Sequence, residues 1–292
     1  MSRKREAFWF YLFISPWLIG FLAFMAYPLI MSFYYSFTSY NVVNPPEFVG
    51  LRNYINLFND RLFRLSVRAT TIYTLAAIPL GLLLSLFFAV LLNRPIPGRT
   101  LFRAFLYFPS MISGVGLSIL WLWIFNPQIG VLNYLLNLFG ISSQLWLLEP
   151  RLAIPSLVIM SLWGLGATTI IFLAALQGVP TTLYEVAMLD GCSPFRRMVN
   201  ITLPLISPVF LFLLITGIIG GFQVFTQAYV MTNGGPNYAT FFYVFYLFRR
   251  GFSDWDIGVA TAMAWLLMVA IIFITILIFK FSKRFVYSEE RS

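Results

Sequence analysis

The sequence predicts an all-α integral membrane protein with six transmembrane helices, and two observations predict it. Hydrophobic residues make up 60% of the 292 residues and charged residues only 10%, with a mean hydropathy of +0.85. A soluble globular protein does not have so large an apolar fraction, so the composition excludes that class. The charged residues also divide the chain into long uncharged stretches, and each of these can cross a hydrocarbon core that needs about 20 apolar residues.

The expected spans belong to a single transmembrane domain of residues 1–292. They lie near 8–33, 69–92, 104–125, 152–177, 208–230 and 257–280. The first is too long for the apolar region of a signal peptide and is kept as a span. Residues 127–148 are rich in Pro, Gly, Asn, Gln and Ser, which suits a loop or a short interfacial helix because unsatisfied polar groups are costly in lipid.

The basic residues predict the orientation, since short loops rich in Lys and Arg stay in the cytoplasm. With the amino terminus inside, twelve of the nineteen Lys and Arg residues fall in inner segments and seven in outer ones. Both termini and residues 178–204 are therefore expected in the cytoplasm. The net charge of +9 is scattered over span ends, which favours contact with membrane lipid and disfavours a nucleic-acid partner.

The sequence lacks the residues that metal binding, ion-coupled transport, ATP hydrolysis and enzymatic catalysis require. The chain has no histidine and one cysteine, Cys192, so we expect no metal site. Every Asp and Glu falls at or outside a span end, whereas ion-coupled carriers usually place such groups inside the membrane. A phosphate loop for ATP is absent from the sequence, and no nucleophile–base pair points to an enzyme. A transporter of this composition must take its energy from another subunit.

The polar segment between spans four and five, residues 178–204, has the signals of two short helices. Thr182 and Glu185 have the spacing of a capping box, which predicts a helix from Leu183. Gly191 stands where a left-handed helix cap is needed, and Ser193-Pro194 provide an N-cap and a first helical residue. On these signals alone, a helix–turn–helix on the membrane face and a plain solvated loop are equally good interpretations.

The same segment resembles a known pattern. It reads Tyr184-Glu185-Val186-Ala187-Met188-Leu189-Asp190-Gly191 and, after nine residues, Ile201-Thr202-Leu203-Pro204. This resembles the cytoplasmic coupling loop, the EAA loop, of permease subunits in binding-protein-dependent ABC importers. Val186 is the one departure, because the family usually has its first Ala there. Pro28-Leu29-Ile30, Gly50-Leu51-Arg52-Asn53-Tyr54 and Thr232-Asn233-Gly234-Gly235-Pro236 resemble sugar permeases of the maltose and glycerol-phosphate type.

The resemblance implies a type I ABC importer permease fold with a cytoplasmic coupling helix between spans four and five. It implies import of a sugar or oligosaccharide across a bacterial or archaeal inner membrane. The implied partners are a second permease subunit in a heterodimer, two ATPase subunits that hold ATP and Mg²⁺, and an extracytoplasmic sugar-binding protein. This chain would bind no cofactor itself.

The residues expected to couple the chain to the ATPase lie in this loop, where Ala187 is small enough for a partner to approach closely. They are Glu185, Val186, Ala187, Leu189, Asp190, Gly191, Arg196, Arg197, Ile201, Leu203 and Pro204.

A substrate pathway is suggested by small and hydrogen-bonding residues within spans four and five. They are Trp163, Gly164, Thr168, Thr216, Gly217, Gly220, Gly221 and Gln223. Sugars suit such a lining, because aromatic faces stack on them and polar side chains bond their hydroxyls. Helix packing is the alternative role of the glycines. For the chain as a whole, an ion-coupled secondary carrier and a non-transport membrane scaffold remain alternatives.

Overall fold

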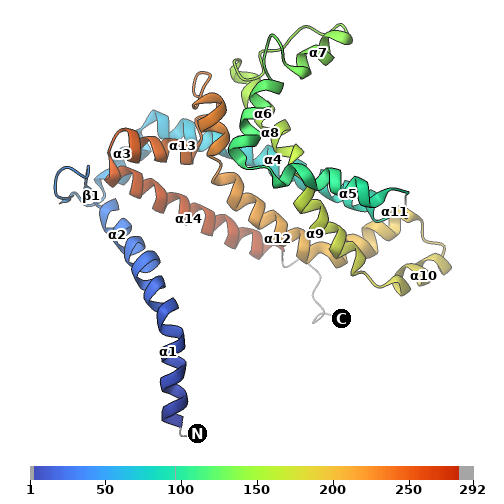
Figure 1. Cartoon of the computed structure of the whole chain (residues 1–292), viewed down its shortest axis with the longest axis horizontal. Coiled ribbons are helices and arrows are strands. Elements are labelled where there is room, and N and C mark those ends of the chain that lie inside the picture. The colour runs from blue at the N-terminus through green and yellow to red at the C-terminus, as the bar shows by residue number, and fades with distance from the viewer. Residues whose placement is uncertain (1–2, 96, 283–292) are drawn as a thin grey trace. The chain divides into compact units, whose positions relative to one another are not determined.

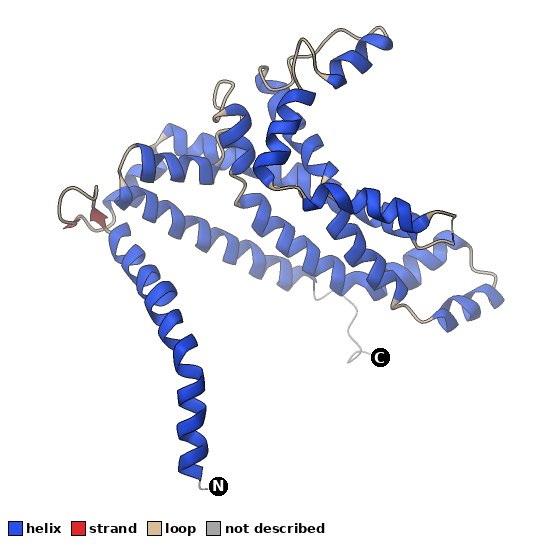
Figure 2. Cartoon of the chain, viewed as in Figure 1, coloured by secondary structure: helices blue, strands red, loops and turns tan. Residues whose placement is uncertain are grey.

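The computed structural model describes residues 3–95 and 97–282. The basic residues of 283–292 that enter the orientation argument lie outside this part. Contacts divide the chain into two compact units: the first is Met1–Asp60 with Leu247–Val269, and the second is Arg61–Tyr246 with Ala270–Ser292. The described chain is almost entirely helical, apart from one small two-stranded sheet (Figure 2). This agrees with the all-α expectation, since helices satisfy their own backbone hydrogen bonds in lipid.

The first unit begins with a continuous helical run of α1 (Arg3–Phe21), a π-helical turn (Leu22–Ala26) and α2 (Tyr27–Ser36). The wide turn directly precedes Pro28, whose ring would clash with a carbonyl of the preceding turn of a regular helix. The antiparallel strands β1 (Thr38–Ser39) and β2 (Glu47–Phe48) follow, and then α3 (Arg52–Asn59). The unit also contains a π-helical turn (Arg249–Ser253) and the first half of α14 (Ile257–Ser282).

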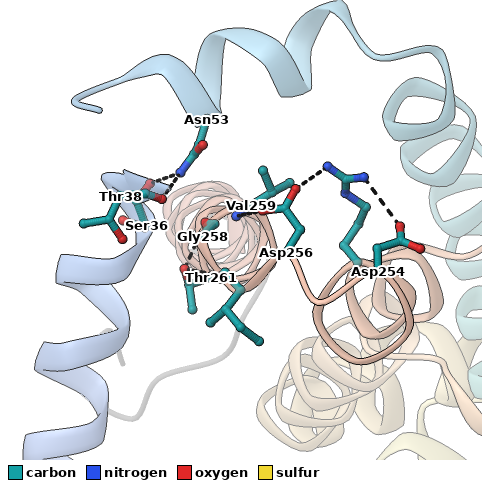
Figure 3. Close-up of polar contacts among 10 residues, drawn as sticks. Ser36, Thr38, Asn53, Asp254, Asp256, Gly258, Val259 and Thr261 are labelled. Atoms are coloured by element: carbon teal, nitrogen blue, oxygen red, sulfur yellow. Dashed lines mark hydrogen bonds and ion pairs between the residues drawn. The ribbon is translucent and has the colours of Figure 1, made fainter. Parts of the chain in front are cut away.

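Polar contacts hold two parts of the first unit in place: the junction of α2 and β1, and the start of α14 (Figure 3). The buried amide of Asn53 donates to the backbone carbonyls of Ser36 at 3.0 Å and Thr38 at 2.9 Å. Arg250 donates to Asp256 at 2.6 Å and to Asp254 at 3.5 Å. Asp256 also accepts from the Val259 N–H at 3.3 Å, which caps the first turn of α14. The Asn53 amide, the Asp256 carboxylate and the terminal nitrogens of Arg250 therefore find their partners within the first unit.

The second unit is built around α4 (Arg61–Leu92). The helices α8 (Pro150–Trp163), α9 (Gly166–Gln177) and α12 (Leu203–Phe222) pack against it (Figure 1). A hydrophobic core consists of buried apolar side chains from α4, α9 and α12 and of Val179, which follows α9: Leu82, Ala89, Phe172, Leu173, Leu176, Val179, Ile206 and Leu213. A buried hydroxyl adds a polar contact, since Thr70 of α4 accepts from the Tyr243 N–H at 2.8 Å.

The remaining helices of the second unit are shorter. They are α5 (Arg99–Tyr107), a 3-10 turn (Phe108–Met111), α6 (Gly114–Ile124), α7 (Val131–Leu138), α10 (Thr181–Leu189), α11 (Pro194–Arg197), π-helical turns at Met198–Thr202 and Ala228–Thr232, and α13 (Tyr243–Phe248), which leads into the first unit. α7 falls within 127–148, where we expected a loop or a short helix.

Four described helical runs are long and apolar enough to cross a membrane: Phe8–Ser36, Arg61–Leu92, Pro194–Phe222 and Ile257–Ser282. The count rises to six if two bent pairs each form one span. The pair Arg99–Met111 and Gly114–Ile124 bends by 102°, and the pair Pro150–Trp163 and Gly166–Gln177 bends by 51°. The expected spans 104–125 and 152–177 are therefore interrupted helices, and the exact bounds of all six spans stay a prediction.

Local chemistry explains both interruptions. After the extended residue Ile112, Ser113 starts a new helix by accepting a hydrogen bond from the Gly116 N–H at 3.3 Å. At the second break, a Cβ on Gly166 would lie 2.3 Å from the carbonyl oxygen of Leu106. Only glycine allows α9 to begin so close to the backbone of α5.

Candidate coupling segment and substrate cavity

The helix α10 begins differently from the prediction. Its N-cap residue is Pro180, without a side-chain cap bond, and Thr181 is its first residue. Thr182 is therefore already inside the helix, and the capping box predicted for Thr182 and Glu185 is wrong. A proline can stand before the first residue of a helix because its φ is fixed and its predecessor avoids the helical conformation, but its side chain has no hydrogen-bond acceptor.

The turn after α10 confirms the local predictions. Gly191 has φ +71°, the left-handed region that glycine adopts at no steric cost. The Cys192 N–H donates to the Ala187 carbonyl at 2.9 Å and the Gly191 N–H to the Met188 carbonyl at 3.1 Å, the two bonds of a Schellman cap. Ser193 then caps α11 by accepting from the Arg196 N–H at 3.4 Å. The two short helices are thus joined by a turn of defined geometry.

One face of α10 is attached to the rest of the second unit. The hydroxyls of Tyr184 and Thr202 share a hydrogen bond of 2.8 Å, and Ala187 is buried. The Ala187 side chain is therefore buried within its own chain, and the approach of a partner to its backbone stays a prediction. Ile201 and Leu203 pack against the core of the second unit, and Pro204 follows a π-helical turn inside the continuous run Pro194–Phe222. These residues attach the α10–α11 segment to the core of the second unit.

The opposite face of the segment is open and apolar. Leu189 is 88% exposed, Phe195 77% and Val186 58%. Glu185, Asp190 and Arg196 are exposed around these side chains, and no ion pair of theirs is found in the described residues. An apolar centre with a charged rim is the usual composition of a protein interface.

A cavity of about 400 Å³ lies between α4, α8, α9 and α12. It brings together six of the residues singled out in spans four and five: Gly164, Thr168, Thr216, Gly217, Gly220 and Gly221. The hydroxyl-bearing residues Tyr73 and Ser161 complete its polar lining, and every residue that lines it is uncharged. Sequence reasoning missed Tyr73, although small and polar residues recur along α4 at helical spacing, as Ser66, Thr70, Tyr73, Thr74, Ala77 and Gly81.

Two expected pathway residues lie elsewhere. Gln223 is the C-cap of α12, because the helix ends at Phe222 and does not continue to residue 230 as expected. Trp163 packs edge-to-face on Trp121, with ring centroids 5.7 Å apart. Neither residue lines the cavity.

The cavity glycines differ in what surrounds them. A Cβ on Gly217 would lie 2.9 Å from Ile78, and one on Gly221 would lie 2.8 Å from Thr74, so both glycines permit close packing of α12 on α4. A Cβ on Gly220 would meet nothing within 4 Å. Packing therefore explains Gly217 and Gly221, whereas Gly220 faces open space.

Comparison with known proteins identifies the family. Residues 69–287 match the family model described as binding-protein-dependent transport system inner membrane component. The chain is 39% identical over 286 residues to the probable ABC transporter permease protein YesP of Bacillus subtilis, covering 96% of this chain and 92% of that protein. It is 34% identical over 281 residues to the trehalose/maltose transport system permease protein MalF of Thermococcus litoralis, covering 95% of each.

Solved structures agree on the fold. A chain of a bacterial ABC transporter involved in the import of the acidic polysaccharide alginate superposes with a TM-score of 0.86 at 24% identity, covering 97% of this chain and 98% of that one. A second structure, of a bacterial alginate ABC transporter in complex with a periplasmic protein that holds an alginate pentasaccharide, gives a TM-score of 0.84. With the family match, these findings replace the carrier and scaffold alternatives. The chain belongs to the inner membrane components of binding-protein-dependent transport systems, and it is a multi-pass, non-catalytic permease subunit of an ABC importer.

Proposed function

We propose that this permease imports a neutral sugar or oligosaccharide. The observation that carries the proposal is the uncharged cavity lined by the hydroxyls of Tyr73, Ser161, Thr168 and Thr216. The Ser161 hydroxyl donates to the Val158 carbonyl and the Thr216 hydroxyl to the Phe212 carbonyl, so these two hydroxyls offer their oxygens as acceptors to sugar hydroxyls. An anionic substrate would leave its charge without a cationic partner in this lining. Among the similar proteins, the trehalose/maltose permease points to a neutral substrate and the alginate importers point to an acidic one, so the cavity lining carries the choice between them.

The assembly that we propose contains this chain, a second permease subunit, two ATPase subunits that bind ATP and Mg²⁺, and an extracytoplasmic binding protein. Both termini and residues 178–204 face the cytoplasm of a bacterial or archaeal cell. The apolar face of Val186, Leu189 and Phe195 docks on an ATPase subunit, and Glu185, Asp190 and Arg196 lie at the rim of that contact. The ATPase has no counterpart in this chain, so the docked segment is the route by which ATP-driven closure reaches the spans.

The Schellman cap at Gly191 and the Tyr184–Thr202 bond supply the stiffness that such a route requires. A force on α10 passes through Tyr184 and Thr202 into the helical run that continues as α12. The residues of α12 that line the cavity, such as Thr216 and Gly220, lie on the same run. Coupling and substrate passage therefore share one element in this proposal.

A size series at Gly220 tests the substrate route, because a side chain there enters the cavity without a clash. The assembled complex, in proteoliposomes with its binding protein, is assayed for uptake of labelled trehalose and maltose, with sn-glycerol-3-phosphate as the charged comparator. We expect Gly220→Ala to transport normally, and Gly220→Leu and Gly220→Trp to lose about tenfold or more of sugar uptake, since a filled pocket excludes the substrate.

Gly20→Leu is the matched control, because Gly20 is also a helical glycine with nothing within 4 Å of its Cβ position and lies outside the cavity. Binding-protein-stimulated ATP hydrolysis is measured in parallel to show that each variant assembles. Full sugar uptake by Gly220→Trp would remove the cavity from the pathway. Uptake of sn-glycerol-3-phosphate in preference to both sugars would overturn the neutral substrate class.

A further inference from the structure

A second, smaller cavity of about 200 Å³ lies where α4 and α9 end and α10 and α11 begin. Its polar lining comes from four places in the chain: Asn93 and Arg94 follow α4, Tyr184 lies on α10, Arg197 ends α11, and Thr202 lies in the π-helical turn. Val90 and Leu176 form an apolar part of the wall. The cavity is separate from the one between α4, α8, α9 and α12.

The charged residues that line this cavity are all positive. Arg94 and Arg197 both line it, and its lining contains no carboxylate. In the described part of the chain, the buried Nε of Arg197 has no hydrogen-bond partner, and neither arginine has an ion pair. Glu185 and Asp190 of the neighbouring helix lie outside the lining. A buried donor on a cation is costly to leave unpaired, and an anion in this cavity would supply a partner for it.

We infer that this cavity binds the phosphate group of an anionic lipid from the cytoplasmic leaflet. Guanidinium groups are the preferred partners of phosphate oxygens, and the side-chain amide of Asn93 supplies a further donor, while the hydroxyls of Tyr184 and Thr202 remain bonded to each other. The inference rests on the orientation proposed above, which places the ends of α4 and α9 at the inner membrane surface.

The position of the site favours a lipid over a carboxylate from an ATPase subunit. The cavity lies at the ends of α4 and α9. α4 is long and apolar enough to cross the membrane, and α9 is the second half of a bent pair that passes the same test. The end of a membrane span lies at the depth of the lipid headgroups. Val90 and Leu176 provide an apolar wall on the side of these helices, which suits the glycerol and the start of the acyl chains. The exposed apolar face of Leu189 and Phe195, in contrast, carries the features of a protein contact.

A phosphate held by both arginines would join the end of α4 to the end of α11. The Tyr184–Thr202 hydrogen bond lies in the same wall, so the bound lipid would stiffen the attachment of α10 to the spans. Anionic lipid should therefore raise the efficiency with which ATP hydrolysis is coupled to the permease.

The test measures lipid retention directly, without transport, so its failure is distinguishable from failure of the proposed function. The purified complex is exchanged into nanodiscs of phosphatidylcholine with rising fractions of phosphatidylglycerol, and the lipids that remain on the permease are identified by native mass spectrometry. We expect the wild type to retain phosphatidylglycerol in preference to phosphatidylcholine. The double variant Arg94→Gln, Arg197→Gln should lose about thirtyfold of that preference, and either single variant about fivefold.

Arg99→Gln is the matched control, because it removes a nearby exposed charge outside the cavity and should leave retention unchanged. Arg197→Lys keeps the charge and should retain most of the preference, which guards against a misfolded double variant. Equal retention by the wild type and the double variant would overturn the inference. Loss of the preference in dilute inorganic phosphate, or its appearance only after the ATPase subunits have been stripped from the complex, would also overturn it, in favour of a free anion or a protein carboxylate.

Discussion

Two regions of the molecule differ in whether their polar side chains are paired. They are the start of α14 in the first unit and the α10–α11 segment in the second unit. Around α14, Arg250 has two carboxylate partners, and the amide of Asn53 has two carbonyl partners (Figure 3). On α10 and α11, Glu185 and Arg196 are exposed without an ion pair among the described residues, and Leu189 points to solvent. The closed network stabilises its own unit, whereas the open segment leaves its groups unpaired and exposed, as our proposal of a partner there requires.

This contrast predicts that changes at α14 affect stability and that changes at α10–α11 affect coupling. The largest effect is expected for Gly258→Ala, because a Cβ there would lie 2.1 Å from the Thr38 carbonyl oxygen, and backbone cannot move aside as a flexible side chain can. We expect a loss of about 3 kcal/mol or more of stability. The measurement is the melting temperature of the purified complex.

Gly20→Ala is the control in the same unit, since nothing lies within 4 Å of its Cβ position and alanine favours a helix. A Gly258→Ala protein that melts like the wild type would contradict the close approach of α14 to β1.

The next effect is expected for Leu189→Asp, which places a charge at the centre of the open face. Binding-protein-stimulated ATP hydrolysis and uptake should fall about tenfold or more, because the carboxylate would be desolvated in the proposed contact with the ATPase. The melting temperature of the isolated permease should stay the same, because Leu189 is 88% exposed. Leu189→Met keeps the apolar contact and should keep activity. Normal coupling in Leu189→Asp would show that the open face is not the docking surface.

The smallest effect is expected for the pair Asp256→Ala and Asp256→Asn, which separates two roles of one carboxylate. Alanine removes both the cap on the Val259 N–H and the contact with Arg250, and should cost about 1 kcal/mol. Asparagine keeps an oxygen for the cap and should cost about half as much, since the ion pair is partly exposed. Chemical or thermal denaturation of the complex measures both. Equal losses would assign the whole effect to the ion pair.

Prediction from the sequence succeeded where the cause is local. Gly191 adopts the left-handed cap and Ser193 caps α11, because each signal needs only its immediate neighbours. The capping box at Thr182 failed because Pro180 is the N-cap and the helix already begins at Thr181, one residue before Thr182. Gln223 was expected within span five, but α12 ends before it.

The sequence by itself determined the membrane class, the apolar segments and the pattern by which the coupling segment resembles its family, since composition and spacing are properties of the chain alone. Only the tertiary structure decided that Gly220 faces a cavity while Gly217 and Gly221 pack against α4, because this depends on what another helix places opposite each glycine. It likewise decided that Arg250 forms ion pairs and that Arg197 forms none among the described residues. Pairing requires groups brought together by packing, and neither periodicity nor charge count along the chain contains that information.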